Sequence, residues 1–462
     1  MIFIFIIGMA LLPIKTVAQT ISGNLSAVKK QPIKLEGFNG LKTYPISSTT
    51  SDEAGNFKLA YSKADYGVGY LMSADNKPLF VILSGEDIEI KGEALSNLQS
   101  LKVIKGRENQ WFEQYAKEHP IREQALTAWD YLEKMYSLNE LFSEQKPPLK
   151  AIQREKQRIK AEDAAFLSTL PSESYVSWFL PARKLVSAVS TVAQYRTQEI
   201  PATIRAFRNL DYSDTRLYKS GLLKDAIESH FWLLENSGTP LDTVFLEMKT
   251  SIDAMMVHLV KDGKKLNEVT GYLFDYLERH SLFQASEHLA LKVLNETSCT
   301  LDIDLANQLE SYRAMKKGNV APDISFGDAA YLNGVKQNQF SRLAELTTPY
   351  TLIVFGASWC PHYMEELPKL TEKYSKWRQL GVEVVYISLD TDKQAFEQAA
   401  KAYPFLAYCD CKKWDTQAAK DYYVFGTPTF YVLNNKREIL VRPNSVAQVD
   451  AWVDWFLMPG SK

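Results

Sequence analysis

The stretch TLIVFGASWCPHYMEELP, residues 351–368, joins a strand pattern to a helix pattern and has one cysteine at the junction. Its first part, 351–355, is a continuous apolar run of the buried-strand type, and residues 361–379 have apolar side chains at helical spacing. Cys360 therefore lies where a helix is expected to begin. Unpaired backbone N–H groups and the helix dipole stabilise a thiolate there, so we predict a reactive thiol rather than a buried structural cysteine.

Strands and helices continue to alternate after this motif. The expected strands contain VEVVYISLD, FLAYCDC, PTFYVLN and EILVRP, and the expected helices cover 392–402, 414–424 and 445–457. This alternation predicts a mainly parallel sheet that ends in an antiparallel hairpin around Asn434 and Asn435. The segment KKGNVAPDISF, residues 316–326, interrupts the preceding helical pattern and is the expected linker.

The rest of the chain shows two other patterns. Residues 19–106 contain short apolar runs such as GNFKLAY, LFVILSG and DIEIKGE, separated by turn residues, which predict a small antiparallel sandwich or barrel. Residues 107–317 have apolar side chains at helical spacing and no fixed repeat, which predicts an all-helical middle region. The predicted fold class is therefore multidomain α+β, with an N-terminal antiparallel β domain, a helical middle and a C-terminal α/β domain at 318–462.

The N-terminus and the composition restrict where the protein works and what it binds. Residues 1–18 are apolar through Leu12 and end in small side chains, as in a secretory signal peptide, although a basic start is missing. We therefore expect export to the periplasm or cell envelope, with no transmembrane anchor after cleavage. The net charge of −2 argues against nucleic acid as a partner. The histidines show no metal-ligand spacing, so neither a metal site nor a cofactor is predicted.

The number and positions of the cysteines indicate a chemical role more than a structural one. The four cysteines, Cys299, Cys360, Cys409 and Cys411, are too few for a secreted scaffold held together by disulfides. All but Cys299 lie in the last quarter of the chain, near the motif described above. Cys299 is expected to fill a helical core.

Two parts of the C-terminal region form a known pattern. They are Trp359-Cys360 with Glu366 and Pro368, and the later segment Gly426-Thr427-Pro428-Thr429-Phe430. With these residues, 319–458 resemble the thioredoxin fold, in particular the TlpA/ResA-like branch of exported thiol–disulfide proteins, a domain of the AhpC/TSA type. The motif of this branch is W-C-x-x-C-x-x-E-x-P, so the second cysteine is missing and Tyr363 stands in its place.

A looser resemblance concerns the N-terminal region. The pattern D-x-x-G-x-F, formed by Asp52, Gly55 and Phe57, is similar to that of the β-rich domain often fused to such thioredoxins. It adds to the expectation that 19–106 form a separate β domain, which would select or dock a partner together with the helical region.

The resemblance implies roles for the motif residues. Cys360 would be the nucleophile, Glu366 a proton acceptor, and Pro428 a substrate clamp in a cis peptide bond. Plainer alternatives are a surface glutamate at 366 and an ordinary strand-initial proline at 428. Pro368 is expected to kink the helix. The expected neighbours of the active site are Trp359, Pro361, His362, Tyr363 and Thr427; Trp359 would shield the sulfur, and a charged His362 would favour the thiolate.

Tyr363 removes the group that normally completes thiol–disulfide exchange. The second cysteine attacks the mixed disulfide and releases the product, which a tyrosine cannot do. Cys409 or Cys411 could act as a resolving thiol, because the C-terminal ends of parallel strands meet at one edge of the sheet. A disulfide with Cys360 would however require Cα atoms within about 7 Å. Cys409 and Cys411 could instead pair with each other or be packing residues.

Three functions follow from these observations. The first is a thiol–disulfide oxidoreductase or isomerase that acts through a single Cys-x-x-Tyr nucleophile on thiol- or disulfide-bearing envelope proteins or peptides. The second is a redox-inactive module that binds peptides or proteins through the thioredoxin fold. The third is a Cys-based antioxidant peroxidase, although the usual Thr/Pro and Arg surroundings of such a thiolate are not evident in ASWCPHY.

Overall fold

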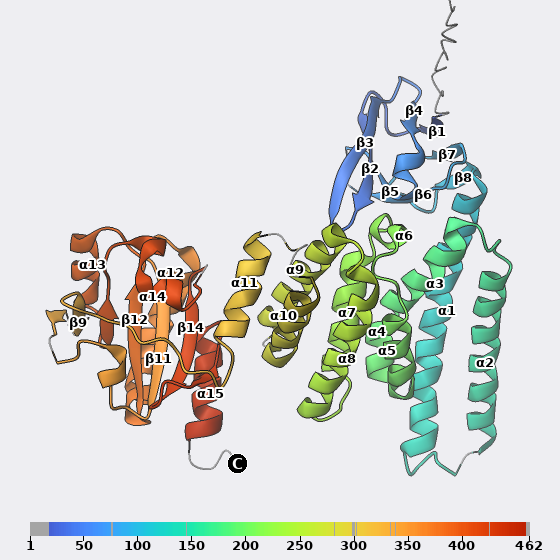
Figure 1. Cartoon of the computed structure of the whole chain (residues 1–462). Coiled ribbons are helices and arrows are strands. Elements are labelled where there is room, and N and C mark those ends of the chain that lie inside the picture. Colours follow the sequence, from blue (N-terminus) through green and yellow to red (C-terminus); the bar gives the residue numbers. More distant parts are fainter. Residues whose placement is uncertain are drawn as a thin grey trace, which may run out of the picture. The chain divides into compact units, whose positions relative to one another are not determined.

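The computed structural model describes residues 18–458, except 75–76, 145, 281, 298–300, 302, 333, 338 and 425. Nearly all of the expected signal peptide, and Cys299, lie outside the described residues. The chain forms two compact units, Met1–Pro240 and Leu241–Lys462 (Figure 1). The boundary between the units falls inside the predicted helical region.

The N-terminal β domain contains eight strands within the described residues. Their bounds are β1 Gln19–Leu25, β2 Pro32–Asn39, β3 Lys42–Thr50, β4 Asn56–Tyr61, β5 Gly67–Met72, β6 Leu79–Leu83, β7 Ile88–Gly92 and β8 Lys102–Lys105. They form two four-stranded sheets, in the orders β4-β1-β7-β8 and β3-β2-β5-β6. Apolar side chains of both sheets, such as Ile21 and Leu35, share one core, so the predicted sandwich is confirmed. The pair β1–β7 is parallel, which the antiparallel prediction did not include.

Helices complete the first unit. They are α1 Arg107–Leu138, α2 Lys146–Ser168, α3 Tyr175–Ser187, α4 Val189–Tyr195, α5 Ile200–Arg208, α6 Thr215–Tyr218 and α7 Leu223–Glu235, with the 3₁₀ helices η1 Lys63–Asp65 and η2 Thr197–Glu199. The buried Asn109 fastens α1 to the β domain: its side-chain oxygen accepts from the Ile82 N–H and its amide donates to the Ile82 carbonyl, each at 2.8 Å. The side chain thus satisfies a strand backbone that would otherwise be buried without partners.

Four helices begin the second unit within the described residues: α8 Leu241–Leu259, α9 Gly263–Arg279, α10 Phe283–Thr297 and α11 Ile303–Ala314. The middle of the chain is therefore helical, as predicted. Hydrogen bonds from Asn444 to the Glu278 carbonyl (2.8 Å) and from Arg442 to the Ser311 carbonyl (3.3 Å) join these helices to the C-terminal domain. Among the described helices, none is both long and apolar enough to cross a membrane.

The C-terminal domain is built on a sheet of seven described strands in the order β10-β9-β13-β12-β11-β14-β15. Their bounds are β9 Ala330–Leu332, β10 Val335–Lys336, β11 Tyr350–Gly356, β12 Val382–Ser388, β13 Leu406–Tyr408, β14 Thr429–Asn434 and β15 Ile439–Val441. Strands β11, β12 and β13 are parallel, and β14 and β15 form the predicted antiparallel hairpin. However, β14 is antiparallel to β11 and β9 is antiparallel to β13, so the sheet is mixed and not mainly parallel as predicted. The helices are α12 Pro361–Gln379, α13 Lys393–Ala400, α14 Gln417–Asp421 and α15 Val446–Leu457, with η3 Leu343–Glu345 and η4 Lys413–Asp415.

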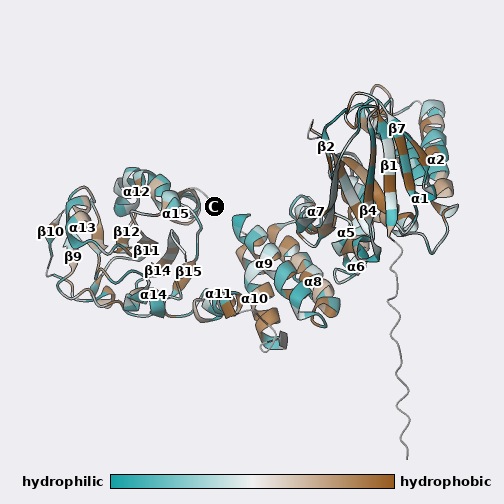
Figure 2. Ribbon diagram, turned by 90° about the horizontal axis from the view of Figure 1, so that it is seen from above, coloured by the Kyte–Doolittle hydropathy of each residue, from teal (hydrophilic) through white to brown (hydrophobic). Residues whose placement is uncertain are grey.

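Helices cover both faces of this sheet. Figure 2 shows α12 and α15 on one face and α14 on the other, with hydrophobic strands between them. Trp377 of α12 is fully buried, and its indole N–H donates to Asp450 of α15 at 3.0 Å. Helix α12 continues through Pro368 to Gln379. This packing fixes the helix whose first turn follows Cys360.

The expected linker at 316–326 is part of the C-terminal domain. The Gly318 N–H donates to the Ile439 carbonyl (2.8 Å), and the Ile439 N–H donates to the Asn319 carbonyl (2.9 Å). Ile324 and Phe326 are each 2% exposed in the core of the domain. Helix α11 ends at Ala314, and the segment that follows pairs with the edge of β15 and is no free linker.

Candidate active site

Cys360 is the N-cap residue of α12, and Pro361 occupies the first turn, where a missing N–H costs nothing. Its thiol donates to the backbone carbonyl of Thr427 at 3.1 Å. The Thr427–Pro428 peptide bond is cis, as the resemblance implied. Cys360 is 8% exposed and borders the core of the domain. The fold thus brings Cys360 together with Thr427 and Pro428, although Cys360 and Thr427 are 67 residues apart in the sequence.

A hydrogen-bonded carboxylate supports the loop before Cys360. Asp390, which is 8% exposed, accepts from the Ser358 N–H (3.0 Å) and the Ser358 hydroxyl (2.8 Å). Its other oxygen accepts from the Ser388 hydroxyl at 2.7 Å. The carboxylate therefore ties the end of β12 to the residue two positions before the thiol. Asp390 was not among the predicted site residues, although an aspartate close to the end of a buried strand is a recognisable signal.

Trp359 lies at the surface beside the loop that follows β13. It is 47% exposed, and its ring meets Trp414 edge-on with centroids 5.8 Å apart. The Lys413 ammonium lies 5.0 Å from the centroid of the Trp359 ring, within the range of a cation–π contact. Pro361 and His362 are also exposed, whereas Thr427 and Pro428 are half-buried. The surroundings of the thiol therefore offer exposed aromatic surface and a backbone carbonyl.

Tyr363 is a core residue. It is 1% exposed, and its ring stacks on Tyr386 of β12 with centroids 5.1 Å apart and planes 5° from parallel. Burial, with Tyr386 and Tyr403 beside it, raises the pKa of the phenol well above its ordinary value. At neutral pH the side chain is therefore an uncharged aromatic group, and it can neither attack a disulfide nor release a client.

Glu366 has structural partners on both carboxylate oxygens. One oxygen accepts from the first N–H of α15, that of Val446, at 2.6 Å, and the other pairs with Lys369 at 2.6 Å. A carboxylate at this position also interacts favourably with the positive end of the α15 dipole. The structure thus gives Glu366 an anchoring contact between α12 and α15, and its role as a proton acceptor stays a prediction.

Cys409 and Cys411 are neighbours of each other, with sulfur atoms 3.6 Å apart. They follow β13, and β12 separates β13 from β11, the strand that leads to Cys360. Cys409 is 5% exposed, and burial raises the pKa of its thiol. The Cys409 thiol donates to the Asp390 carbonyl at 3.4 Å. A direct link from either cysteine to Cys360 stays a prediction.

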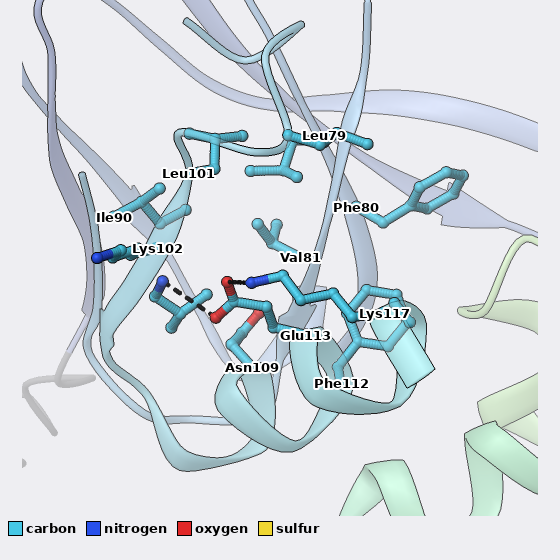
Figure 3. A pocket seen from close by; sticks show the side chains of 13 residues that line it. Leu79, Phe80, Val81, Ile90, Leu101, Lys102, Asn109, Phe112, Glu113 and Lys117 are labelled. Carbon is cyan, nitrogen blue, oxygen red and sulfur yellow. Dashed lines mark hydrogen bonds and ion pairs between the residues drawn. The ribbon is translucent and has the colours of Figure 1, made fainter. Parts of the chain in front are cut away.

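The first unit contains an apolar pocket of about 150 Å³ between β6 and α1 (Figure 3). Val81 and Phe112 are among its lining side chains, and Glu113 and Lys117 form an ion pair of 2.6 Å at its side. Glu113 also accepts from the Val103 N–H at 3.2 Å. The lining is mostly apolar, and Glu113 and Lys117 already have partners, so we assign no chemistry to this pocket.

The C-terminal domain is similar to known thiol–disulfide proteins. Residues 349–439 match a family described as thioredoxin-like. Thiol-disulfide oxidoreductase ResA of Oceanobacillus iheyensis is 26% identical over 136 residues, which cover 29% of this chain and 68% of ResA. Probable nucleoredoxin 1 of Arabidopsis thaliana is 32% identical over 111 residues, which cover 23% of this chain and 19% of that protein, so the chain spans only a small part of this relative.

Among solved structures, a thioredoxin-like protein from Bacteroides caccae aligns with 56% of this chain and 93% of its own. The two share 17% sequence identity, and the TM-score is 0.44. Sequence, strand order and the family match together identify the C-terminal region as a thioredoxin-like domain homologous to thiol–disulfide oxidoreductases of the ResA type.

Proposed function

We propose that this protein is an exported thiol–disulfide oxidoreductase or isomerase that acts through one nucleophile, the thiol of Cys360. The observation that carries the proposal is the position of this sulfur, at the start of α12 and 3.1 Å from the Thr427 carbonyl. A sulfur at this position faces the unpaired backbone N–H groups of a helix start, and the thiolate is the form of a cysteine that attacks disulfides. The apolar segment at 1–18 supports export.

The chemistry begins with attack of the Cys360 thiolate on one sulfur of a client disulfide. The client S–S bond breaks, a mixed disulfide with Cys360 forms, and the second client sulfur leaves as a thiolate that takes a proton from water. Release then needs another thiol, because position 363 holds a buried, neutral phenol. A second client thiol would give isomerisation, and an external small thiol would give net reduction of the client.

The surface around the Cys360 sulfur indicates what kind of client fits the site. Cys360 is only 8% exposed, so a disulfide on an extended, accessible segment suits the site better than one inside a folded core. The half-buried Thr427 and Pro428 border such a segment, and the exposed Trp359 offers it an aromatic contact. We therefore propose thiol- or disulfide-bearing envelope proteins or peptides as partners.

The test is exchange with a small-molecule disulfide and with a disulfide-bearing peptide. The double variant Cys409→Ser/Cys411→Ser should retain formation of the mixed disulfide with the peptide, and adding Cys360→Ser to this double variant should abolish it. Unchanged capture of the peptide by the triple variant would remove the proposal. Hydrogen peroxide, supplied in place of the disulfide, tests the peroxidase alternative on the same variants.

A second function, a redox-inactive binding module, is favoured by the burial of Tyr363. Its ring is part of the core and stands where the second cysteine of a Cys-x-x-Cys pair would lie, so the domain lacks the pair that gives turnover. Tyr363→Cys separates the two functions. If the native protein shows no exchange and this variant gains reductase activity, the domain is a binder; if the native protein already forms and resolves mixed disulfides, it is an enzyme.

A further inference from the structure

The loop after β13 holds two thiols in contact. The sulfur atoms of Cys409 and Cys411 are 3.6 Å apart, and the Cys411 N–H donates to the Cys409 sulfur at 3.3 Å. The two residues are separated by Asp410 alone, so their Cα atoms lie within about 7 Å, a span that a disulfide can bridge. A modest approach of the two sulfur atoms would therefore close a Cys-x-Cys disulfide.

The backbone of this loop is held in an uncommon conformation. Cys411 has a φ of 58° and Lys413 a φ of 54°, both in the left-handed region that residues other than glycine seldom adopt. Such conformations persist where surrounding contacts enforce them, and they concentrate at functional sites. Here the left-handed backbone lies at Cys411, the residue whose thiol meets that of Cys409.

The two thiols differ in access. Cys409 is 5% exposed, and its thiol donates to the Asp390 carbonyl at 3.4 Å, whereas Cys411 is half-buried at the edge of the core. Burial raises the pKa of Cys409, so this thiol stays protonated at neutral pH until its partner has reacted. The arrangement assigns the outer position to Cys411 and the inner position to Cys409.

We propose that Cys409 and Cys411 form a second thiol–disulfide centre, separate from Cys360, in which Cys411 meets the incoming disulfide and Cys409 resolves it. The substrate class is a disulfide on a small thiol compound or a peptide. The loop continues into η4, where Lys413 and Trp414 contact Trp359 beside Cys360. The two centres therefore lie on neighbouring parts of one surface, where a single client can reach both.

The reaction balances as a two-electron exchange. The Cys411 thiolate attacks the substrate disulfide, whose S–S bond breaks; a mixed disulfide forms and one substrate thiol leaves after taking a proton from water. Cys409 then loses its proton to water and attacks the Cys411 sulfur. The Cys409–Cys411 bond forms, the second substrate thiol leaves with a proton, and the substrate disulfide has been reduced to two thiols while the loop dithiol has been oxidised.

The experiment uses full-length Cys360→Ser protein, so that its outcome does not depend on the function proposed for Cys360. The reduced protein is titrated with oxidised glutathione without air, then denatured, alkylated and digested with trypsin. Cleavage after Lys401 and Lys412 releases residues 402–412, which contain Cys409 and Cys411, while Cys299 falls in another peptide. The expected product is this peptide without alkyl groups and with two hydrogen atoms fewer.

Two variants in the same background assign the roles. With Cys409→Ser, Cys411 should accumulate as a mixed disulfide with glutathione because no partner can resolve it. With Cys411→Ser, Cys409 should react at least about tenfold more slowly, since each unit by which a pKa is raised removes about tenfold of the thiolate. The proposal is overturned if peptide 402–412 stays doubly alkylated or doubly glutathionylated at every glutathione ratio, or if Cys409 reacts as fast alone as the pair does.

Discussion

The ring of Tyr363 lies directly against the backbone of Gly356, in the space that a side chain at position 356 would need. Gly356 is the last residue of β11, and glycine inside a strand weakens it through backbone entropy and a missing side chain. Here the missing side chain admits the tyrosine ring, which is stacked on its other side by Tyr386. Glycine and tyrosine thus form one packing unit beneath the active-site helix.

We predict that Gly356→Ala destabilises the domain by about 1–3 kcal/mol, because the added methyl group would overlap the Tyr363 ring. Hydrogen exchange of peptides from β11 under increasing denaturant measures the loss. Gly271→Ala is the matched control: this helical glycine of α9 has nothing within 4 Å of an added Cβ, so the change should be neutral or stabilising. Equal losses in both variants would contradict the packing argument.

Tyr363→Cys should lower the free energy of unfolding by roughly 2–4 kcal/mol, because it removes a buried aromatic ring and leaves a cavity beside Gly356. The same change supplies a second thiol three residues after Cys360, so any gain in dithiol exchange should come with a loss of stability. Denaturant titrations compare Tyr363→Cys with Tyr363→Phe, which keeps the ring but adds no thiol, and so show how much stability the ring contributes. A fully stable Tyr363→Cys variant would show that the ring is dispensable.

Substitutions of Glu366 distinguish an anchoring role of this carboxylate from a role in proton transfer. Glu366→Gln keeps an oxygen that can accept from the Val446 N–H, so we expect nearly native stability, whereas Glu366→Ala should lose about 1–2 kcal/mol. If the glutamate only anchors α15, both variants should exchange disulfides at nearly the native rate. A general base would instead show a loss of about a hundredfold or more in Glu366→Gln, with an altered pH profile.

Asp450 should make the stability of the domain depend on acid pH. Partial burial acts to raise its pKa, but hydrogen bonds from Lys376, Trp377 and Lys373 outweigh this and hold the pKa at about 2. The pKa is thus below the unfolded value of about 4, so the stabilisation is complete above about pH 4 and is lost as pH falls towards about 2.

Asp450→Asn should therefore reduce the fall in the free energy of unfolding of the C-terminal domain between about pH 4 and pH 2. Asp454→Asn is the control, because Asp454 also pairs with Lys376 but its side chain is 47% exposed. Denaturant titrations at several pH values measure both slopes. If Asp450→Asn keeps the slope of the native protein, the carboxylate does not carry this pH dependence.

Much of the C-terminal fold could be predicted because its signals are local. The helix at 361–379 was expected with the bounds that the structure shows, since its apolar spacing and its proline start depend only on neighbouring residues. The strand pattern of β11 and β12 and the hairpin of β14 and β15 are equally local. The absence of a second cysteine at 363 is likewise evident from the sequence.

The contacts that give the site its chemistry could not be predicted, because they join residues far apart in the chain. The Glu366 carboxylate meets Val446, the Cys360 thiol meets the Thr427 carbonyl, and Asp390 joins the loop of Ser358 to the end of β12. The segment 316–326 carries turn residues, yet its backbone pairs with β15. Local patterns record backbone preferences and exposure, whereas the partner of a polar or nucleophilic group is chosen by packing, which only the folded chain reveals.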